Sequence, residues 1–152
     1  MSVAKEIAII CNILAMAYLH SEEFKMCQEL LKKAEVYTQV GNPRIRAITF
    51  NNYACLFRKT KKLRNALLYL EKALEIEYDQ MNYPENEEDE TLRVEQLLAI
   101  SNPCEIHLNI CAILSQMEKH EVALNHAMKA LILIQDELCE RIEMIGSGQI
   151  TV

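Results

Sequence analysis

Apolar residues recur at intervals of three and four along most of the chain, which is the period of α-helices that bury one face. Gly41-Asn42-Pro43 interrupts this pattern. The glycine suits the position just after a helix, the asparagine suits a cap, and the proline suits the first turn of the next helix. Asn102-Pro103 repeats the cap-and-proline signal. These marks predict new helices beginning near 43 and near 103.

One spacing of apolar residues occurs three times. A large–small pair is followed after two residues by a large residue, and then by four positions at intervals of six, three, four and three. The instances are Leu14-Ala15, Tyr18, Phe24, Cys27, Leu31 and Ala34; Tyr53-Ala54, Phe57, Leu63, Ala66, Leu70 and Ala73; and Ile110-Cys111, Leu114, His120, Ala123, Ala127 and Ala130. The interval of six crosses a turn, and the small residues let two helices approach closely. The spacing therefore predicts three antiparallel helix pairs and an all-α protein.

This spacing resembles the tetratricopeptide repeat family, whose unit is about 34 residues long. Three units fit, at about 8–41, 47–80 and 104–137. The chain departs from the family pattern because it has no Trp, has Ala or Cys in place of the family's Gly, and has no Pro closing a unit. The resemblance implies helix pairs stacked as a right-handed superhelical solenoid. We predict one domain over 1–145 and, from Gly146-Ser147-Gly148, a flexible tail over 146–152.

The three units are unevenly spaced. Tyr18 and Phe57 are 39 residues apart, whereas Phe57 and Leu114 are 57 apart, which leaves 23 residues beyond a standard unit. Five of the six residues in 85–90 are acidic. We predict an acidic linker over 81–91, interpreted as a solvated loop with a contact for a basic partner as the alternative. A short helix is predicted over 91–100.

Composition removes several classes of protein. Only three Gly and three Pro occur in 152 residues, too few for the turns of an all-β domain. The net charge of −6 argues against nucleic acid and against an anionic membrane surface as partners. The six cysteines form no C-x-x-C pair, which indicates reduced thiols in a cytoplasmic compartment. The apolar run 7–19 is interpreted as the first helix, with a cleaved signal as the alternative.

Candidate catalytic chemistry is sparse. Cys104, His107 and Cys111 lie three and four residues apart on one predicted helix, so they can share a face. Zinc usually takes four ligands, and these three fall on core positions of the repeat, so we interpret them as packing residues. A metal-dependent enzyme or sensor is the third-ranked hypothesis. Phosphate-binding loops and nucleophile motifs are absent from the sequence, and we expect no catalysis, cofactor or small-molecule substrate.

A basic cluster occupies the predicted turn of the second unit. Its members are Arg58, Lys59, Lys61, Lys62 and Arg64. The favoured interpretation is a solvated turn. The alternative is an electrostatic contact with an acidic tail, such as that of tubulin, or with a neighbouring subunit. Nucleic acid is disfavoured because no aromatic residues are interleaved with the cations.

In tetratricopeptide proteins the first helices of the units line a groove that holds a peptide or helix. The resemblance implies that this groove includes Ile9, Asn12, Ile13, Met16, Asn51, Asn52 and Asn109. The alternative is that Ile9 and Ile13 are covered by another part of the same chain. In the chaperone-binding members a carboxylate clamp of Lys, Arg and Asn residues is used. Only Asn52 matches that clamp, and Glu105 would repel the ligand, so this type is disfavoured.

The last predicted helix runs from His120 to about Ile145 without a breaker. It carries an apolar stripe, which we call the docking stripe, made of Leu131, Ile134, Leu138, Ile142 and Ile145. Terminal repeats normally present a polar outer face to stay soluble. The sequence therefore predicts that a partner covers the stripe or that the chain lies inside a larger assembly.

These observations favour a non-catalytic scaffold subunit that joins other protein subunits in a larger assembly. The range 107–138 is also similar to repeats in tetratricopeptide proteins of ciliated protists, including axonemal ones, which implies a cytoskeletal or ciliary location in the cytoplasm. The alternative hypothesis is a peptide-binding adaptor or co-chaperone that works alone.

Overall fold

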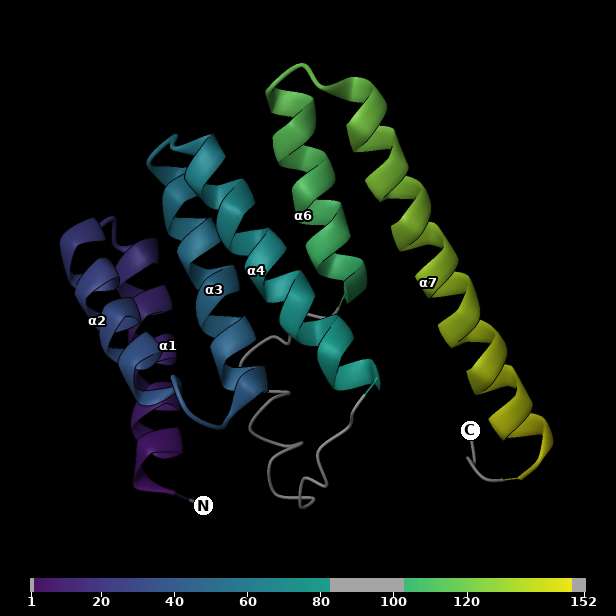
Figure 1. Cartoon of the computed structure of the whole chain (residues 1–152), viewed down its shortest axis with the longest axis horizontal. Helices are drawn as coiled ribbons and strands as arrows, with labels where there is room; N and C mark the ends of the chain where they lie inside the picture. Colours follow the sequence, from purple (N-terminus) through teal and green to yellow (C-terminus); the bar gives the residue numbers. More distant parts are fainter. Residues whose placement is uncertain (1, 83–102, 149–152) are drawn as a thin grey trace. The chain divides into compact units, whose positions relative to one another are not determined.

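The computed structural model describes residues 2–82 and 103–148, and every regular element within these two ranges is an α-helix (Figure 1). The helices are α1 (Val3–His20), α2 (Phe24–Tyr37), α3 (Pro43–Lys59), α4 (Leu63–Asn82), α6 (Pro103–Gln116) and α7 (His120–Gly146). The all-α prediction is confirmed, as are helix starts at the two prolines. The superhelical stacking of the pairs stays a prediction. The predicted short helix and most of the acidic linker and tail lie outside the described residues.

The helices form three antiparallel pairs, α1 with α2, α3 with α4, and α6 with α7 (Figure 1). Residues 1–102 and 103–152 form two compact units, and each is described by itself. The first unit holds α1 to α4, and the second holds α6 and α7. The prediction of one domain over 1–145 stays a prediction.

The turns inside the three pairs share one backbone geometry. Glu22, Lys61 and Glu118 take the left-handed conformation, with φ of 60°, 59° and 61°. The amide after each of them donates to a carbonyl five residues earlier, on Tyr18, Phe57 and Leu114 respectively, at 2.7–2.9 Å. This is the hydrogen-bond pattern of a Schellman cap. The turns therefore align the three pairs residue by residue, in the same register as the sequence repeat.

The connection from α2 to α3 differs in detail from the sequence prediction. Gly41 has a φ of 74°, as expected for a glycine after a helix, and Pro43 begins α3. Asn42, predicted as a side-chain cap, instead takes the left-handed conformation with a φ of 52° and makes no capping hydrogen bond. Asparagine adopts this conformation more readily than most residues, so it shapes the turn through its backbone.

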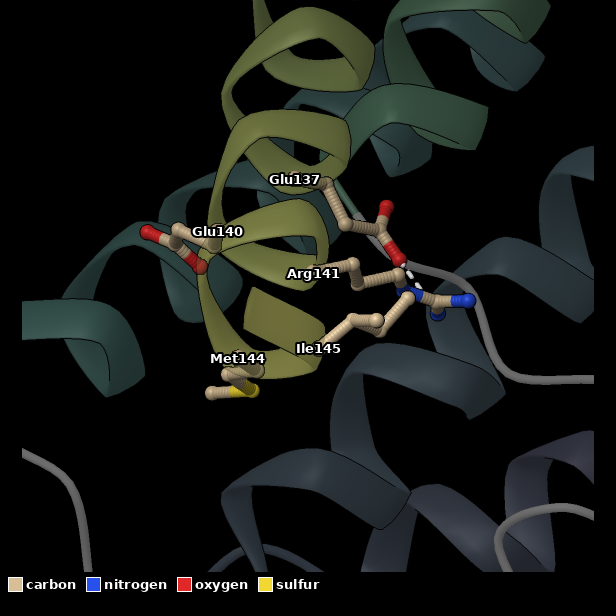
Figure 2. A pocket seen from close by; sticks show the side chains of 5 residues that line it. All are labelled: Glu137, Glu140, Arg141, Met144 and Ile145. Atoms are coloured by element: carbon tan, nitrogen blue, oxygen red, sulfur yellow. Dashed lines mark hydrogen bonds and ion pairs between the residues drawn. The ribbon is translucent and has the colours of Figure 1, made fainter. Parts of the chain in front are cut away.

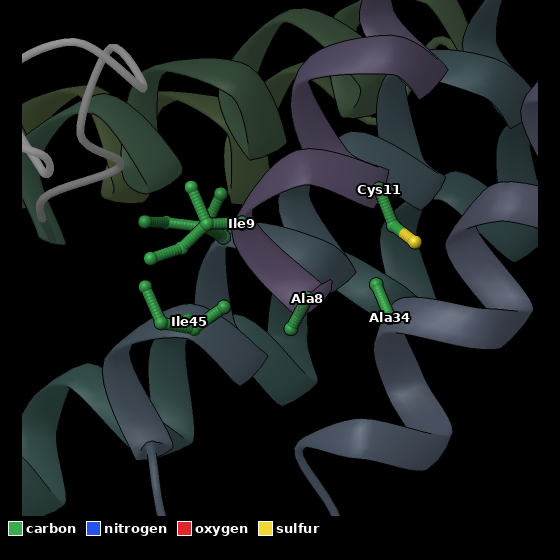
Figure 3. Close-up of a cluster of buried hydrophobic side chains, with 6 residues drawn as sticks. Ala8, Ile9, Cys11, Ala34 and Ile45 are labelled. Atoms are coloured by element: carbon green, nitrogen blue, oxygen red, sulfur yellow. The ribbon is translucent and has the colours of Figure 1, made fainter. Parts of the chain in front are cut away.

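The core of the first unit is built around α3, which packs against α1, α2 and α4. One apolar cluster joins the first three helices (Figure 3), and its members are Ala8, Ile9, Cys11, Ala34, Ile45 and Ile48. Small residues of the repeat are fully buried where helices meet, as predicted: Ala15, Cys27, Ala34, Ala66 and Ala73. Their size sets how closely the paired helices approach.

Aromatic side chains connect α3 with α4. Tyr69 of α4 packs on Tyr53 and Phe57 of α3, with ring centroids 4.7 and 5.4 Å apart, and edge-on against Phe50 at 5.6 Å. The Lys72 ammonium lies 4.8 Å from the centre of the Tyr69 ring, within the range of a cation–π contact. Phe50, Tyr53 and Phe57 are buried, whereas Tyr69 is half-buried and Lys72 is exposed.

In the second unit α6 buries Ile106, Ile110, Ile113 and Leu114, while α7 contributes Ala123 and Ala130. The two helices differ in length, with 14 residues in α6 and 27 in α7. From Leu131 to Gly148 no residue is buried. The second half of α7 therefore carries its apolar side chains outside the core of this unit.

Candidate interaction surfaces

Three predicted groove residues lie inside the first unit. Asn12 is fully buried, and Ile9 and Asn52 are also buried. The Asn12 amide donates to Thr49 Oγ1 and to the Ala8 carbonyl, each at 2.9 Å, and the Asn52 amide donates to Asn12 Oδ1 at 2.9 Å. The Thr49 hydroxyl donates to the Ile45 carbonyl at 2.8 Å. These bonds form a polar network between α1 and α3.

The groove prediction is therefore corrected for Ile9, Asn12 and Asn52. Their spacing placed them on one face of their helices, but that face meets the neighbouring helix of the same chain. The amides of Asn12 and Asn52 are used within the fold and are not presented to a peptide. A buried polar network of this kind fixes how two helices align, because other registers leave its groups unpaired.

The other four groove residues keep some exposure. Ile13 is exposed, and Met16, Asn51 and Asn109 are half-buried. Asn51 Oδ1 is itself buried and has no hydrogen-bond partner among the described residues. Asn109 lies in the second unit, on α6. Contact of these four residues with a partner stays a prediction.

The docking stripe lies along the second half of α7. Leu131, Ile134, Leu138, Ile142 and Ile145 are between 40% and 64% exposed. Single exposed apolar residues are ordinary on a protein surface, whereas a continuous row of five indicates an interaction site. Binding at this row is a prediction, but its side chains are available for it.

An open pocket of about 450 Å³ adjoins the end of the docking stripe (Figure 2). Its lining combines charged and apolar side chains of α7, namely Glu137, Glu140, Arg141, Met144 and Ile145. Arg141 Nη2 is paired with Glu137 Oε1 at 2.7 Å, one helical turn away. This exposed pair contributes little to stability. The lining contains no nucleophile beside a base, so we interpret the pocket as part of the surface of the stripe.

All five residues of the basic cluster are exposed. Arg58 and Lys59 lie in the last turn of α3, where cations are favoured by the negative end of the helix dipole. Stabilisation of α3 therefore accounts for two of the five cations. Contact with an acidic partner stays a prediction.

His107 belongs to a pair that sequence reasoning missed. Its side chain is 1% exposed, and its Nδ1 lies 2.8 Å from Nδ1 of His126 on α7. One ring of such a pair donates an N–H to the other, so the two rings share at most one proton between the facing atoms. Cys104 Sγ, on the same helix as His107, lies 3.6 Å from the Ala130 carbonyl. Within the described ranges, no group of three or more His, Cys, Asp or Glu residues is placed to hold a metal.

Of four cysteines with perturbed thiols, Cys11 and Cys27 are buried and Cys55 and Cys104 are half-buried. Burial raises the pKa of Cys27 to about 11 and also raises the pKa of Cys11, Cys55 and Cys104. A protonated thiol is a poor nucleophile and a poor metal ligand. We therefore expect these four thiols to stay protonated at neutral pH.

The histidine pair predicts a loss of stability in mild acid. Burial, the charge of His126 and the charge of Lys129 all lower the pKa of His107 below its ordinary value of 6.5. His107 therefore binds a proton more readily in the unfolded chain than in the folded chain. The free energy of unfolding consequently falls as the pH drops below 6.5. We expect a slope of at most about 1.4 kcal/mol per pH unit for one proton.

Urea unfolding followed by circular dichroism between about pH 7.5 and pH 5.5 measures this slope. His107→Gln is expected to flatten it, while His120→Gln, at an exposed position on α7, is the matched control and leaves it unchanged. An equal slope in all three proteins contradicts the assignment to His107.

The outer face of α1 is a second apolar surface, of which the predicted groove includes only Ile13. Ile10, Ile13, Leu14 and Tyr18 are 36–55% exposed. By length and composition α1 is also apolar enough to cross a membrane, a test that core helices and signal sequences pass as well. The buried hydrogen bonds of Asn12 to α3 favour a core helix.

Comparison with protein-family models, with curated proteins and with solved structures finds no match.

Proposed function

We propose that this chain is a non-catalytic interaction module, built of tetratricopeptide-like helix pairs, that joins other proteins into a larger assembly. The observation that carries the proposal is the docking stripe, a row of five exposed apolar side chains on a part of α7 where no residue is buried. Covering such a row removes apolar surface from water, which is the main driving force of association. A cytoplasmic location, in a cytoskeletal or ciliary assembly, stays a prediction from the sequence.

The alternative, a peptide-binding adaptor, has less support. Three of its seven groove residues are buried, and two of those three use their amides to hold α1 against α3. A peptide reaches these groups only if the two helices separate. Two exposed surfaces, the docking stripe and the outer face of α1, are apolar helix faces, and these suit a helical partner better than an extended peptide.

Two acidic substitutions in the stripe test the proposal. Leu138→Asp with Ile142→Asp is expected to abolish stable partner complexes and leave the helical circular dichroism unchanged, because both side chains are more than half exposed. The measurement is crosslinking and mass spectrometry of complexes formed by the full chain in its native cell type. We expect at least a tenfold loss of recovered partners, which corresponds to about 1.4 kcal/mol.

The matched control is Val122→Asp with Ile132→Asp. It introduces the same charge at two exposed apolar positions of α7, on sides of the helix turned away from the stripe. The control is expected to keep the partners. Recovery of the same complexes with the stripe variant contradicts the proposed function.

A further inference from the structure

The shared turn geometry lets equivalent residues of the three helix pairs be compared directly. Ile10, Ile13 and Leu14 of α1 correspond to Thr49, Asn52 and Tyr53 of α3, because the turns of these pairs are 39 residues apart. The two sets differ in environment. The α1 residues are exposed, whereas the α3 residues are buried against the preceding helix pair.

The buried residues of α3 form the contact through which α3 packs on the α1–α2 pair. Thr49 and Asn52 are hydrogen-bonded to Asn12 of α1. Burial raises the pKa of Tyr53, and the Glu35 carboxylate of α2, which interacts with its hydroxyl, raises it further. The guanidinium of Arg46 donates to the Thr38 carbonyl at 3.3 Å. The receiving surface on the first pair therefore includes Asn12, Glu35 and Thr38.

The same receiving positions exist on the last pair, 96 residues further along. They are occupied by Leu108 of α6 and by Leu131 and Ile134 of α7, which are exposed. Each polar residue of the internal receiving surface is thus an apolar residue here. On the inserting side, Thr49, Asn52 and Tyr53 are likewise replaced on α1 by Ile10, Ile13 and Leu14.

We propose that the occupant of this receiving surface is the α1 face of a second copy of the chain, stacked head to tail as α3 stacks on the first pair. The internal register then brings Leu108 against Ile10 and Ile13, and Leu131 against Leu14. Every polar pair of the internal contact becomes an apolar pair between copies. This proposal rests on the proposed function, since it names the partner that covers Leu131 and Ile134 of the docking stripe.

The proposed contact is heterologous, because it joins two different surfaces of the same chain. Such a contact forms open rows that lengthen with concentration, whereas pairing of two identical surfaces stops at a dimer. The register also brings Glu6, the counterpart of Ile45, near Glu105, the counterpart of Ile9. Screening of this like-charge pair predicts that added salt strengthens the association.

Sedimentation velocity of the full chain between about 5 and about 200 µM tests the proposal, because association follows mass action. The wild type is expected to form species larger than a dimer as its concentration rises. Leu14→Asp blocks the α1 face, and Leu131→Asp blocks the receiving surface, so each variant alone is expected to be a monomer. Val122→Asp, on the opposite side of α7 from Leu131, is the control and is expected to associate like the wild type.

The decisive sample is the mixture of the two blocked variants. Leu14→Asp keeps an intact receiving surface and Leu131→Asp keeps an intact α1 face, so the mixture is expected to form a one-to-one dimer and nothing larger. Circular dichroism of each variant checks its fold, and Ile10→Asp replaces Leu14→Asp if helix is lost.

Three results overturn the proposal. They are a wild type that stays monomeric, a Leu14→Asp protein that associates by itself, and a mixture that forms no dimer. A monomeric wild type whose partner complexes depend on Leu138 and Ile142 overturns the stacking of copies and leaves the proposed function standing. A monomeric wild type whose complexes ignore these two residues overturns both.

Discussion

Replacing Asn12 by alanine is expected to lower the free energy of unfolding of the first unit by about 2–4 kcal/mol. The substitution removes a fully buried side chain that bonds to Thr49 and accepts from Asn52. The Asn52 amide then loses its acceptor inside the protein, and an unsatisfied buried group carries its full desolvation penalty. A small cavity between α1 and α3 adds to the loss.

Urea unfolding followed by circular dichroism measures this effect. Asn65→Ala, at an exposed position in α4, is the control and is expected to change stability by less than about 0.5 kcal/mol. A double-mutant cycle with Asn52→Ala is expected to give a coupling energy of about 0.5–3 kcal/mol, because the two amides contact each other. Additive effects within error contradict the network.

Tyr53→Ala is expected to have the larger effect, a loss of about 3–5 kcal/mol. The Tyr53 ring is buried and packs on Phe57 and Tyr69, while its hydroxyl interacts electrostatically with Glu35. The substitution therefore opens a cavity in the aromatic cluster. It also removes a contact through which α3 stacks on α2.

Tyr18→Ala is the matched control, since Tyr18 also lies on the first helix of a pair but is about a third exposed. We expect it to cost less than Tyr53→Ala, because about a third of Tyr18 is already in contact with water whereas Tyr53 is buried. Tyr53→Phe separates the two contributions, since it keeps the ring and loses only the hydroxyl and its interaction with Glu35, at about 0.5–1.5 kcal/mol. Equal losses for Tyr53→Ala and Tyr18→Ala contradict the packing described for α3.

The sequence predicted the helices well because a 3.6-residue period and a few breakers are local signals. Cys27, Ala34 and Ala73 were identified as small contact residues from spacing alone, and all three are fully buried. The left-handed residues in the turns were not foreseen, since Glu22 and Glu118 are not types that favour this conformation. Their conformation follows from the Schellman hydrogen bonds that close each helix.

The candidate sites were harder to predict because spacing shows which residues share a face but not what covers that face. Asn12 and Ile13 are neighbours in the predicted groove, yet the first is buried against α3 and the second is exposed. His126 was overlooked because its partner, His107, lies on another helix. A contact between helices depends on how they pack, and a single sequence does not state this.

The length of α7 has a consequence for the kinetics of recognition. Its part after Ala130 contributes no buried residue, and most of the stability of helices in proteins comes from packing of a buried face. Amide hydrogens in this part are expected to exchange with solvent much faster than those of α3, through local opening. A partner that covers the stripe must also hold this segment helical, which lowers the affinity gained from each contact. Amide hydrogen exchange over 131–145 is therefore expected to slow when a partner binds. The exchange rate in the free protein reports how often this segment is helical before a partner arrives.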